Sequence, residues 1–341
     1  MSQSFFSRCN QLSPRLVGRQ LGQVFSNSFH VPARPRKSGS KISNASIKQS
    51  TQRILKLIKS LQSSSLRISS LTDFGPDHSN HCLRYIHQLS LSPGSFDNWI
   101  TTFNRFLRAV GKFELTESGS SLRESVGLPS RTRYCIENKS PSDLEALHFR
   151  IEAINREDSN VGAVLQLLEA LPLRVREAAS LNVKTAAQEA RIGQVISLTK
   201  GTKNGRPRKV QIWDERQVLV LENLVPLTNE LYGSLIPTDQ TLKHFLSRFY
   251  RITRKHSLTR ETRMNPHSLR HLGLQRLFTQ VTGLPPPIFG IGPNLKQSDS
   301  RAREGFQSVS EAAGHCDRNK ASAYLGSIRA YRSKLHVGAK K

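Results

Sequence analysis

The sequence predicts a mostly α-helical chain with one small β-hairpin, divided between a helical N-terminal domain and a larger α+β domain. Three observations support this fold class. Apolar residues recur every three or four positions in several segments, which is the spacing of one helix face. Two short runs, at 191–198 and 208–213, are instead typical of strands, and Asn204-Gly205 between them is a strong hairpin signal. The length of 341 residues suits two domains and a tail.

Residues 1–44 are expected to form a basic, disordered arm. The segment has seven Lys or Arg residues and no acidic residue, and its 'PARPRKSGSK' stretch at 32–41 cannot sustain a helix. Such an arm either follows DNA phosphates or is only a disordered leader, and the composition allows both readings. A mitochondrial transit peptide has a similar composition, but no other feature of the sequence supports one.

Residues 45–130 are expected to form a helical domain with basic outer faces. One predicted helix, at 46–61, has an apolar stripe of Ile47, Ile54, Leu57, Ile58 and Leu61. A second follows 'SLSPGS' and ends near Gly111, with apolar side chains at Trp99, Phe103, Phe106, Leu107 and Val110. The composition of 114–138 suits a linker between two domains.

Residues 131–341 are expected to form the larger domain. Helical patterns cover 141–156, 161–170, 239–255 and 266–281, around the hairpin. Ser140, followed by Pro141, is the expected cap of the first of these helices. The segment 283–305 contains three consecutive prolines and several glycines, so we expect it to be an exposed loop insertion.

The charge excludes several classes of protein. Lys and Arg number 51 against 25 Asp and Glu, which gives a net charge of +26 and indicates a polyanionic partner rather than a small metabolite. No apolar run is long enough for a transmembrane helix, and none resembles a secretory signal. Cys9, Cys82, Cys135 and Cys316 form no metal-binding pattern, so we expect free thiols in a reducing compartment.

Two pairs of polar residues in the larger domain precede the helices predicted at 239–255 and 266–281. Arg174 and Glu177 are three residues apart at the start of a helix, where a carboxylate can orient a guanidinium. Lys200 and Lys203 lie on the predicted hairpin, where an ammonium group could reach a phosphate. Taken separately, the first is an ordinary surface ion pair and the second a solvated turn.

Two further groups follow. His267 and Arg270 lie three apart at the start of a helix, and together they suit a phosphate clamp. His315 follows Gly314, and Tyr324 comes nine residues later. A tyrosine in such a segment can also be a packing residue, which is how we interpret Tyr232, Tyr250 and Tyr331.

The order of these groups resembles the tyrosine recombinase (phage integrase) family. The resemblance is best over 160–325, and the helical block at 45–112 resembles the SAM-like core-binding domain of that family. It implies a C-shaped clamp on DNA and the catalytic residues Arg174, Lys203, His267, Arg270, His315 and Tyr324. In that family the arginines neutralise the phosphate, and Tyr324 would be the nucleophile. Lys203 would protonate the leaving oxygen, His267 would help remove the tyrosine proton and His315 would bind a non-bridging oxygen.

The sequence departs from the family pattern in two places. Pro172-Leu173 stands where a glycine usually precedes the first arginine, and the interval between Arg270 and His315 is longer than usual because of 283–305.

The resemblance implies a site-specific recombinase that integrates or excises a bacterial mobile element through a 3′-phosphotyrosine intermediate. Its partners would be double-stranded DNA, three further copies in a tetramer, and accessory DNA-bending or directionality factors, in the cytoplasm at the nucleoid and away from any membrane. No cofactor and no metal are expected, because the sequence has neither an acidic cluster for Mg²⁺ nor the spacing of a Walker A loop. The alternatives are DNA relaxation by a type IB topoisomerase and a non-catalytic DNA-binding protein.

Overall fold

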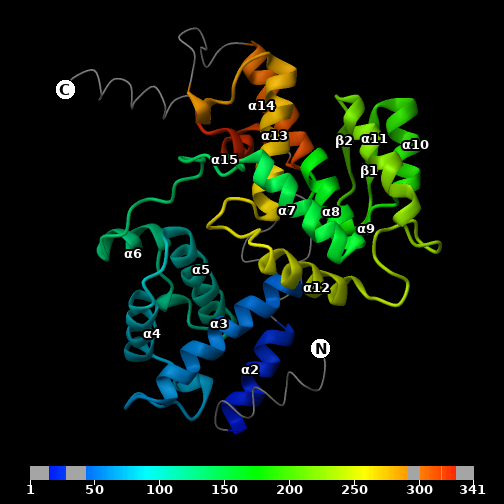
Figure 1. The fold of residues 1–341 in the computed structure, drawn as a ribbon. Helices are drawn as coiled ribbons and strands as arrows, with labels where there is room; N and C mark the ends of the chain where they lie inside the picture. Colours follow the sequence, from blue (N-terminus) through cyan, green and yellow to red (C-terminus); the bar gives the residue numbers. More distant parts are fainter. Residues whose placement is uncertain (1–14, 28–43, 291–299, 316, 328–341) are drawn as a thin grey trace, which may run out of the picture. The chain divides into compact units, whose positions relative to one another are not determined.

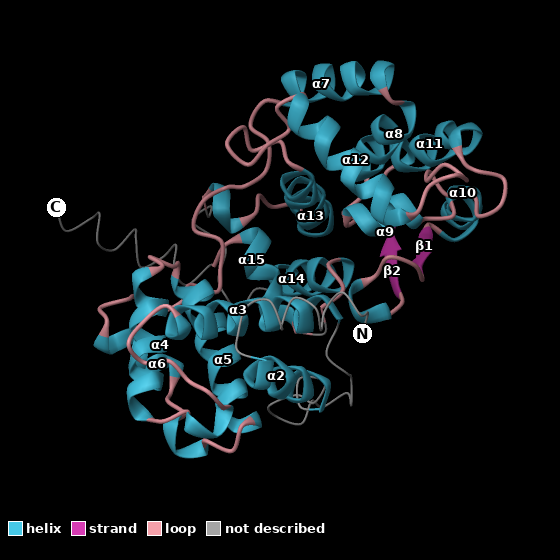
Figure 2. Ribbon diagram, turned by 90° about the horizontal axis from the view of Figure 1, so that it is seen from below, coloured by secondary structure: helices cyan, strands magenta, loops and turns pink. Residues whose placement is uncertain are grey.

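The computed structural model describes residues 15–27, 44–290, 300–315 and 317–327. Within these ranges the chain is mostly helical and has one two-stranded antiparallel sheet (Figure 2), which confirms the predicted fold class. The chain divides into two compact units, Met1–Arg131 and Thr132–Lys341. No helix in these described ranges has the length and apolar character needed to cross a membrane.

The first unit is a bundle of helices around one apolar core (Figure 1). Its elements are α2 (Arg15–Asn27), α3 (Asn44–Gln62), η1 (Leu71–Asp73), α4 (Pro76–Gln88), α5 (Pro93–Ala109), η2 (Phe113–Leu115) and α6 (Gly119–Ser125). The stripe predicted for 46–61 is buried in α3, and the aromatic side chains of α5 are buried against it. Pro93 occupies the first turn of α5, and Gly111 follows its end with a φ of 78°.

Helix α2 corrects the expectation that the whole of 1–44 is a disordered arm. Val17, Leu21 and Phe25 repeat every four residues and are fully buried in the core of the first unit. Gln20 also accepts a hydrogen bond of 2.8 Å from the backbone NH of Leu71. The three apolar residues are enough to hold the helix on the domain, although the surrounding composition is polar. Residues 1–14 and 28–43 of the expected arm lie outside the described residues.

The second unit contains the remaining elements. They are α7 (Leu144–Glu157), α8 (Ser159–Ala170), α9 (Val175–Ser180), α10 (Val183–Gly193), β1 (Val195–Leu198), η3 (Lys203–Gly205), β2 (Arg208–Gln211), α11 (Glu215–Leu224), η4 (Val225–Leu227), α12 (Leu242–Lys255), α13 (Pro266–Thr282), η5 (Pro287–Phe289), α14 (Ser300–Ala312), η6 (Arg318–Ala321) and α15 (Ser322–Leu325). The four helices predicted in this domain are present as α7, α8, α12 and α13, with their ends moved by a few residues.

The caps of two helices show how local sequence sets their starts. Asp143, not Ser140, caps α7, because its carboxylate accepts a hydrogen bond of 2.9 Å from the NH of Ala146. Asn265 caps α13 by accepting from the first two NH groups after Pro266. This cap fixes the first turn of α13, where two of the predicted site residues lie.

The hairpin has a longer loop than the Asn204-Gly205 signal indicates. Strand β1 pairs with β2 in a register that sets Val195 opposite Gln211 and Leu198 opposite Arg208, so residues 199–207 connect them. At the base of this loop Gly201 has a φ of 71°, and a Cβ there would lie 2.3 Å from the carbonyl oxygen of Arg176. Only glycine therefore allows the loop to lie directly on α9.

The expected loop at 283–305 is shorter than predicted, because α14 begins at Ser300. Helix α14 packs along α13, and a Cβ at Gly305 would lie 2.4 Å from Cγ2 of Thr282. The Phe306 ring also meets Phe278 edge-on, with centroids 5.7 Å apart. This tertiary packing stabilises a helix that was not predicted from the sequence, because the start of the segment is rich in Pro and Gly. Residues 291–299 lie outside the described residues.

Helix α13 contributes to two apolar clusters of the second unit. Its Leu269 packs in the large cluster formed mainly by α7 to α12, whereas Leu274 and Phe278 pack with α14 and α15. The buried helix α13 thus provides a fixed support for a site between the two clusters.

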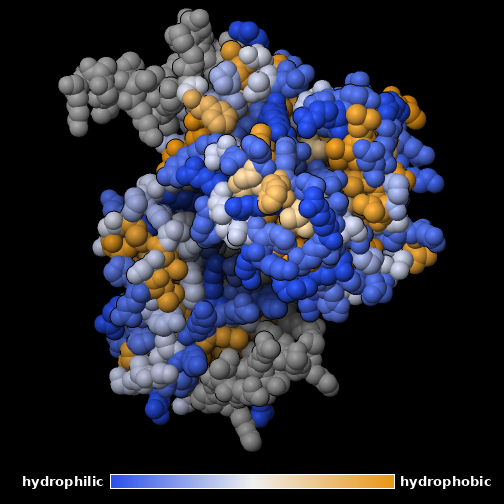
Figure 3. All heavy atoms as spheres, in the orientation of Figure 1, coloured by the Kyte–Doolittle hydropathy of each residue, from blue (hydrophilic) through white to orange (hydrophobic). Residues whose placement is uncertain are grey.

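On the face shown in Figure 3, hydrophilic side chains predominate, and hydrophobic patches lie over α10 and α11. Those two helices carry the exposed side chains of Ile192 and Leu219.

Candidate active site

A buried carboxylate, Glu177 on α9, organises three arginines. Its side chain is fully buried and accepts hydrogen bonds from the backbone NH of Arg174 (2.7 Å), the Arg174 guanidinium (2.6 Å) and the Arg208 guanidinium (2.7 Å). The Nη1 atom of Arg270 lies 3.6 Å from the same carboxylate. Arg174 comes from the start of α9, Arg208 from β2 and Arg270 from α13, so one carboxylate fixes side chains from three elements.

The charge state of Glu177 follows from these partners. Burial by itself would raise the pKa of Glu177, but the hydrogen bonds and charges of Arg208 and Arg174 lower it to about 2. Glu177 is therefore ionised at neutral pH, and its negative charge partly compensates the three guanidinium groups. The arrangement stays cationic, because three positive charges surround one negative charge.

Arg270 is almost fully buried, with 2% of its side chain exposed. Its Nη1 donates to the carbonyl oxygen of Pro172 at 2.6 Å and its Nη2 donates to that of Ala313 at 2.9 Å. The Nε atom is buried without a partner among the described residues. Burial lowers the pKa of Arg270 to about 10, so this side chain remains charged at neutral pH. A buried cation with an unused N–H donor is a suitable ligand for an anion.

The carbonyl of Ala313 joins the two predicted catalytic arginines. Arg174 also donates to it from Nη2, at 2.9 Å. Next in the chain, Gly314 has a φ of 71°, and a Cβ there would lie 2.9 Å from Cδ of Arg208. The turn that ends α14 is thus held against the arginine cluster, and it presents His315 directly beside them.

His267, His271 and Tyr324 form a cluster of rings. The centroids of His267 and His271 are 4.9 Å apart, as are those of His271 and Tyr324, and His267 lies 6.3 Å from Tyr324. The guanidinium of Arg270 lies 5.9 Å from the Tyr324 ring centroid. Tyr324 is 8% exposed and belongs to the one-turn helix α15. Helices α13 and α15 therefore bring the predicted nucleophile to the predicted His267 and Arg270.

The histidines of this cluster are held in the neutral form. Burial lowers the pKa of His271 to about 3. His267 keeps an exposed edge, but the protein packed around its ring removes part of its hydration, and this effect together with the charge of Arg270 lowers its pKa. A neutral imidazole can accept a proton, which an imidazolium cannot do.

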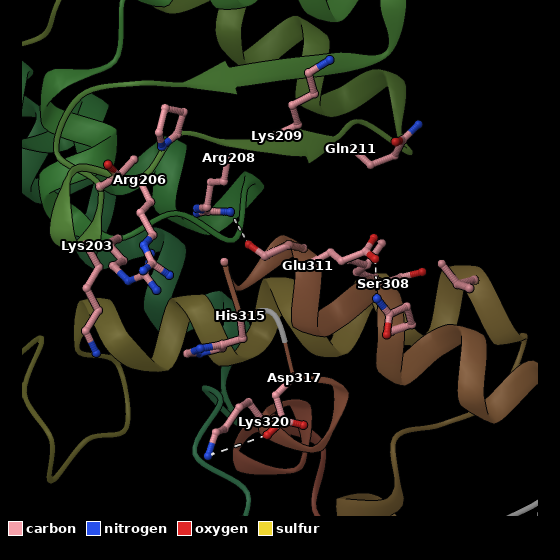
Figure 4. Close-up of a pocket in the computed structure, with 18 of the residues that line it drawn as sticks. Lys203, Arg206, Arg208, Lys209, Gln211, Ser308, Glu311, His315, Asp317 and Lys320 are labelled. Carbon is pink, nitrogen blue, oxygen red and sulfur yellow. Dashed lines mark hydrogen bonds and ion pairs between the residues drawn. The ribbon is translucent and has the colours of Figure 1, made fainter. Parts of the chain in front are cut away.

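Lys203 and His315 lie on the wall of an open cavity of about 920 Å³ that Arg174 also lines. Figure 4 shows Lys203, Arg206, Arg208 and Lys209 of the hairpin region on one side and Glu311 of α14 on another, with His315 between them. Six Lys or Arg and three Asp or Glu residues line the cavity. Partial burial, followed by the charges of Arg174, Arg270 and Lys203, lowers the pKa of His315.

The six predicted residues thus form two adjoining groups. Arg174, Lys203 and His315 line the cavity, whereas His267, Arg270 and Tyr324 surround the ring cluster and are not part of the cavity wall. The shared carbonyl of Ala313 connects the two groups.

Sequence reasoning missed Arg208 and His271 as members of this site. Arg208 lies on the same face of β2 as the buried Val210. A basic residue at an inward-facing position of the predicted strand could therefore have indicated its buried role. His271 directly follows Arg270 and shares the apolar face of α13 with Leu274, which marks it as a buried histidine.

The arrangement suits the binding of a phosphate diester beside a phenol. The remaining N–H groups of Arg174 and Arg270, with Lys203 and His315, are donors for phosphate oxygens. Among the described residues no three His, Cys, Asp or Glu side chains gather in a group that could hold a metal ion.

Comparison with known proteins shows a resemblance to integrases and site-specific recombinases. A family model described as Integrase matches residues 136–275. The integrase of the Tn1549 transposon, solved with transposon right end DNA, is 13% identical, with a TM-score of 0.55 over 94% of this chain and 99% of that chain. The XerH site-specific recombinase, solved with its difH substrate before cleavage, is 14% identical, with a TM-score of 0.51 over 97% of this chain and 93% of that chain.

These structural likenesses show a shared fold across both units of the chain, and no curated protein matches it. The family match covers the part of the second unit that carries Arg174, Lys203, His267 and Arg270. The chain therefore resembles the Integrase family over residues 136–275 and shares its fold with these recombinases.

Proposed function

We propose that this protein is a site-specific DNA recombinase that integrates or excises a mobile element. It cleaves and rejoins double-stranded DNA through a covalent bond between Tyr324 and a 3′-phosphate. The observation that carries this proposal is the meeting of Tyr324 with Arg270 and a neutral His267, next to a cationic cavity lined by Arg174, Lys203 and His315.

The first chemical step is an attack of the Tyr324 hydroxyl oxygen on the scissile phosphorus. A phenol has a pKa of about 10, so it becomes a good nucleophile only when its proton is removed or its anion is stabilised. The neutral ring of His267 accepts that proton, and the charge of Arg270 stabilises the phenolate. The bond from phosphorus to the 5′-oxygen breaks as the bond from phosphorus to Tyr324 forms.

The developing charge is neutralised by preorganised donors. Arg174 and Arg270 bind the non-bridging oxygens of the phosphate, and His315 adds a further donor from the turn after α14. Because Glu177 and the Ala313 carbonyl already fix the two guanidinium groups, little reorganisation is needed when charge builds up. Lys203 supplies the proton to the departing 5′-oxygen.

The same reaction run in reverse rejoins the DNA without ATP. A 5′-hydroxyl attacks the phosphotyrosine, and the energy of the phosphodiester bond is conserved in the covalent intermediate. The residues in the site provide proton transfer and charge neutralisation by themselves, so the proposed reaction uses no cofactor. It takes place on DNA in the cytoplasm, at the bacterial nucleoid.

The DNA partner follows from the charge. A net charge of +26 favours binding along a polyanion, and we propose that both units bind the duplex. Each chain has one Tyr324, and exchange between two duplexes requires the cutting of four strands, so four copies would assemble on two sites. Accessory DNA-bending or directionality factors would act on that assembly.

Nicked duplexes with random sequence provide a test that needs no knowledge of the recombination site. A nick beside the cleavage position lets a short strand diffuse away and traps the covalent complex. The full chain, incubated with such a library in EDTA, is expected to give a protein–DNA adduct that survives denaturation, and sequencing the trapped strands would define the site.

A second measurement uses the sequence found in this way. Two duplexes that carry it should yield recombinant products with the wild-type protein. Relaxation of supercoiled DNA without strand exchange would instead identify a type IB topoisomerase activity. DNA binding without any adduct would identify a non-catalytic DNA-binding protein.

A further inference from the structure

The helix that carries Tyr324 has few hydrogen bonds of its own. Helix α15 has four residues, and its closing bond runs from the NH of Gly326 to the carbonyl of Ser322. One helical turn is unstable in isolation, so the position of the nucleophile depends on contacts from other segments. Those contacts come from α13 and from the stretch 135–140, which directly follows the boundary between the two units.

Two groups outside α15 donate hydrogen bonds to its backbone. The NH of Cys135 donates to the carbonyl of Ser322 at 2.9 Å. Nε2 of Gln275, on α13, donates to the carbonyl of Tyr324 itself at 3.1 Å. The carbonyl of the nucleophilic residue is therefore held by a side chain of α13.

The orientation of the Gln275 amide is determined by a neighbouring chain of hydrogen bonds. The NH of Ser140 can only donate, and it donates to Asn138 at 3.1 Å, so the atom of Asn138 at that position is its oxygen. The same oxygen lies 3.2 Å from the Gln275 amide, which must present Nε2 to it. Nε2 therefore faces two acceptors, the oxygen of Asn138 and the carbonyl of Tyr324.

This orientation has an energetic cost. Gln275 is 3% exposed, and its Oε1 is buried without a hydrogen-bond partner among the described residues. A buried unpaired oxygen is unfavourable, and it persists where the surroundings require it. Here the two acceptors on the other side of the amide require Nε2 to donate twice.

We propose that Gln275 and Asn138 are positioning residues for the nucleophile, and that they tie the Tyr324 backbone to the segment that connects the two units. This inference rests on the proposed function, in which Tyr324 attacks DNA. Gln275 touches neither DNA nor the reacting atoms. It acts by fixing the carbonyl of Tyr324, and Asn138 acts by fixing the amide of Gln275.

Two isosteric substitutions separate this role from simple packing. Gln275→Glu keeps the shape but places an oxygen opposite both acceptors, so it should lower the single-turnover cleavage rate by about tenfold or more. Asn138→Asp keeps an acceptor for the Ser140 NH and hydroxyl and for the Gln275 amide, so it should cleave within about twofold of wild type. Both variants should bind DNA as wild type does, because neither side chain belongs to the cavity wall.

The pH dependence provides a further readout. Burial raises the pKa of a carboxyl group introduced at position 275, so lowering the pH protonates it and restores one O–H donor. The rate ratio of wild type to Gln275→Glu should therefore become smaller as the pH falls. A defect caused only by altered packing would give a ratio that does not change with pH.

The decisive experiment measures hydrogen–deuterium exchange of residues 318–327 in the full chain, together with adduct formation on nicked DNA. Faster exchange is expected in Gln275→Glu and in Asn138→Ala, and wild-type exchange in Asn138→Asp. If Gln275→Glu does not fold, the two Asn138 variants give the comparison.

The outcomes separate the two proposals. Equal exchange and equal cleavage in Asn138→Ala and Asn138→Asp would overturn the positioning inference. The expected exchange pattern without any adduct in wild type would support the positioning of α15 and would contradict the proposed DNA cleavage.

Discussion

The guanidinium of Arg208 and the carboxylate of Glu177 form an ion pair of 2.7 Å in which the two side chains are 7% and 0% exposed. Arg208 also donates to the carbonyls of Ala312 and Pro172. One side chain of β2 thus connects α9, the end of α14 and the segment before Arg174. The cluster of arginines is part of the folded core of the second unit as well as a candidate phosphate site.

The first prediction concerns the stability that this ion pair provides. Arg208→Met leaves Glu177 buried with less compensation, and the loss of one partner of a buried pair costs about 3–5 kcal/mol. Urea unfolding of the full chain should show this loss in the transition of the second unit. The matched control is Arg156→Met, which breaks the exposed pair with Glu152 and should cost less than about 1 kcal/mol. Equal effects of the two substitutions would contradict the buried role of Arg208.

The second prediction concerns acid stability and His271. Its pKa falls from 6.5 to about 3 on folding, so the unfolded chain binds the proton more readily between these values. The contribution of His271 to the free energy of unfolding is fully present above about pH 6.5. It decreases as the pH falls towards 3, by at most about 1.4 kcal/mol per pH unit. His271→Asn should give a flatter decrease in the free energy of unfolding over this range. An identical decrease in the variant would mean that His271 is not buried in its neutral form.

The third prediction concerns α2. Leu21 is fully buried in the first unit, so Leu21→Ala should destabilise that unit by about 2–5 kcal/mol. Arg19 lies on the exposed side of the same helix, and Arg19→Ala should leave stability unchanged. Thermal unfolding by circular dichroism distinguishes these results. If α2 is dispensable, Leu21→Ala will unfold at the wild-type temperature.

About half of the α-helices in the described ranges, and the two strands, could be predicted from the sequence, because their signals are local. The periodic apolar residues of 46–61 and 266–281 identify α3 and α13, and the alternation in 208–213 identifies β2. Helices α4, α10 and α11 were not predicted, and α2 and α14 were missed because polar or Pro/Gly-rich neighbours dominate the composition around them. Their stability comes from tertiary packing of a few residues, such as Gly305 against Thr282.

The residues of the candidate site also divide into those with a local sequence signal and those that depend on tertiary contacts. The three-residue intervals of Arg174 to Glu177 and of His267 to Arg270 indicated side chains on one helix face, and the resemblance to the tyrosine recombinase family marked Arg174, His267 and Arg270 as candidate catalytic residues. The roles of Arg208 and Gln275 depend on partners that are distant in the sequence. Arg208 meets Glu177 only through the pairing of β2 with β1, and Gln275 meets Tyr324 only when α15 packs on α13.

The fourth prediction concerns Lys203 as the general acid. Lys203→Ala should slow cleavage of ordinary DNA by about 10²-fold or more, within the range that general acids contribute. A substrate with sulfur in place of the bridging 5′-oxygen has a leaving group that needs no proton, so it should restore the rate of this variant. Lys209→Ala is the control, because Lys209 lines the same cavity from β2. A defect that sulfur does not relieve would exclude Lys203 as the proton donor.

The central claim is that Tyr324 is the residue joined to DNA, and adduct formation by tyrosine variants tests it most directly. Tyr324→Phe removes one oxygen and should abolish the denaturation-resistant adduct on nicked DNA, while DNA affinity and thermal stability remain close to wild type. Tyr331→Phe should leave the adduct intact. An adduct that persists in Tyr324→Phe and disappears in Tyr331→Phe would contradict the account and assign the nucleophile to the later tyrosine.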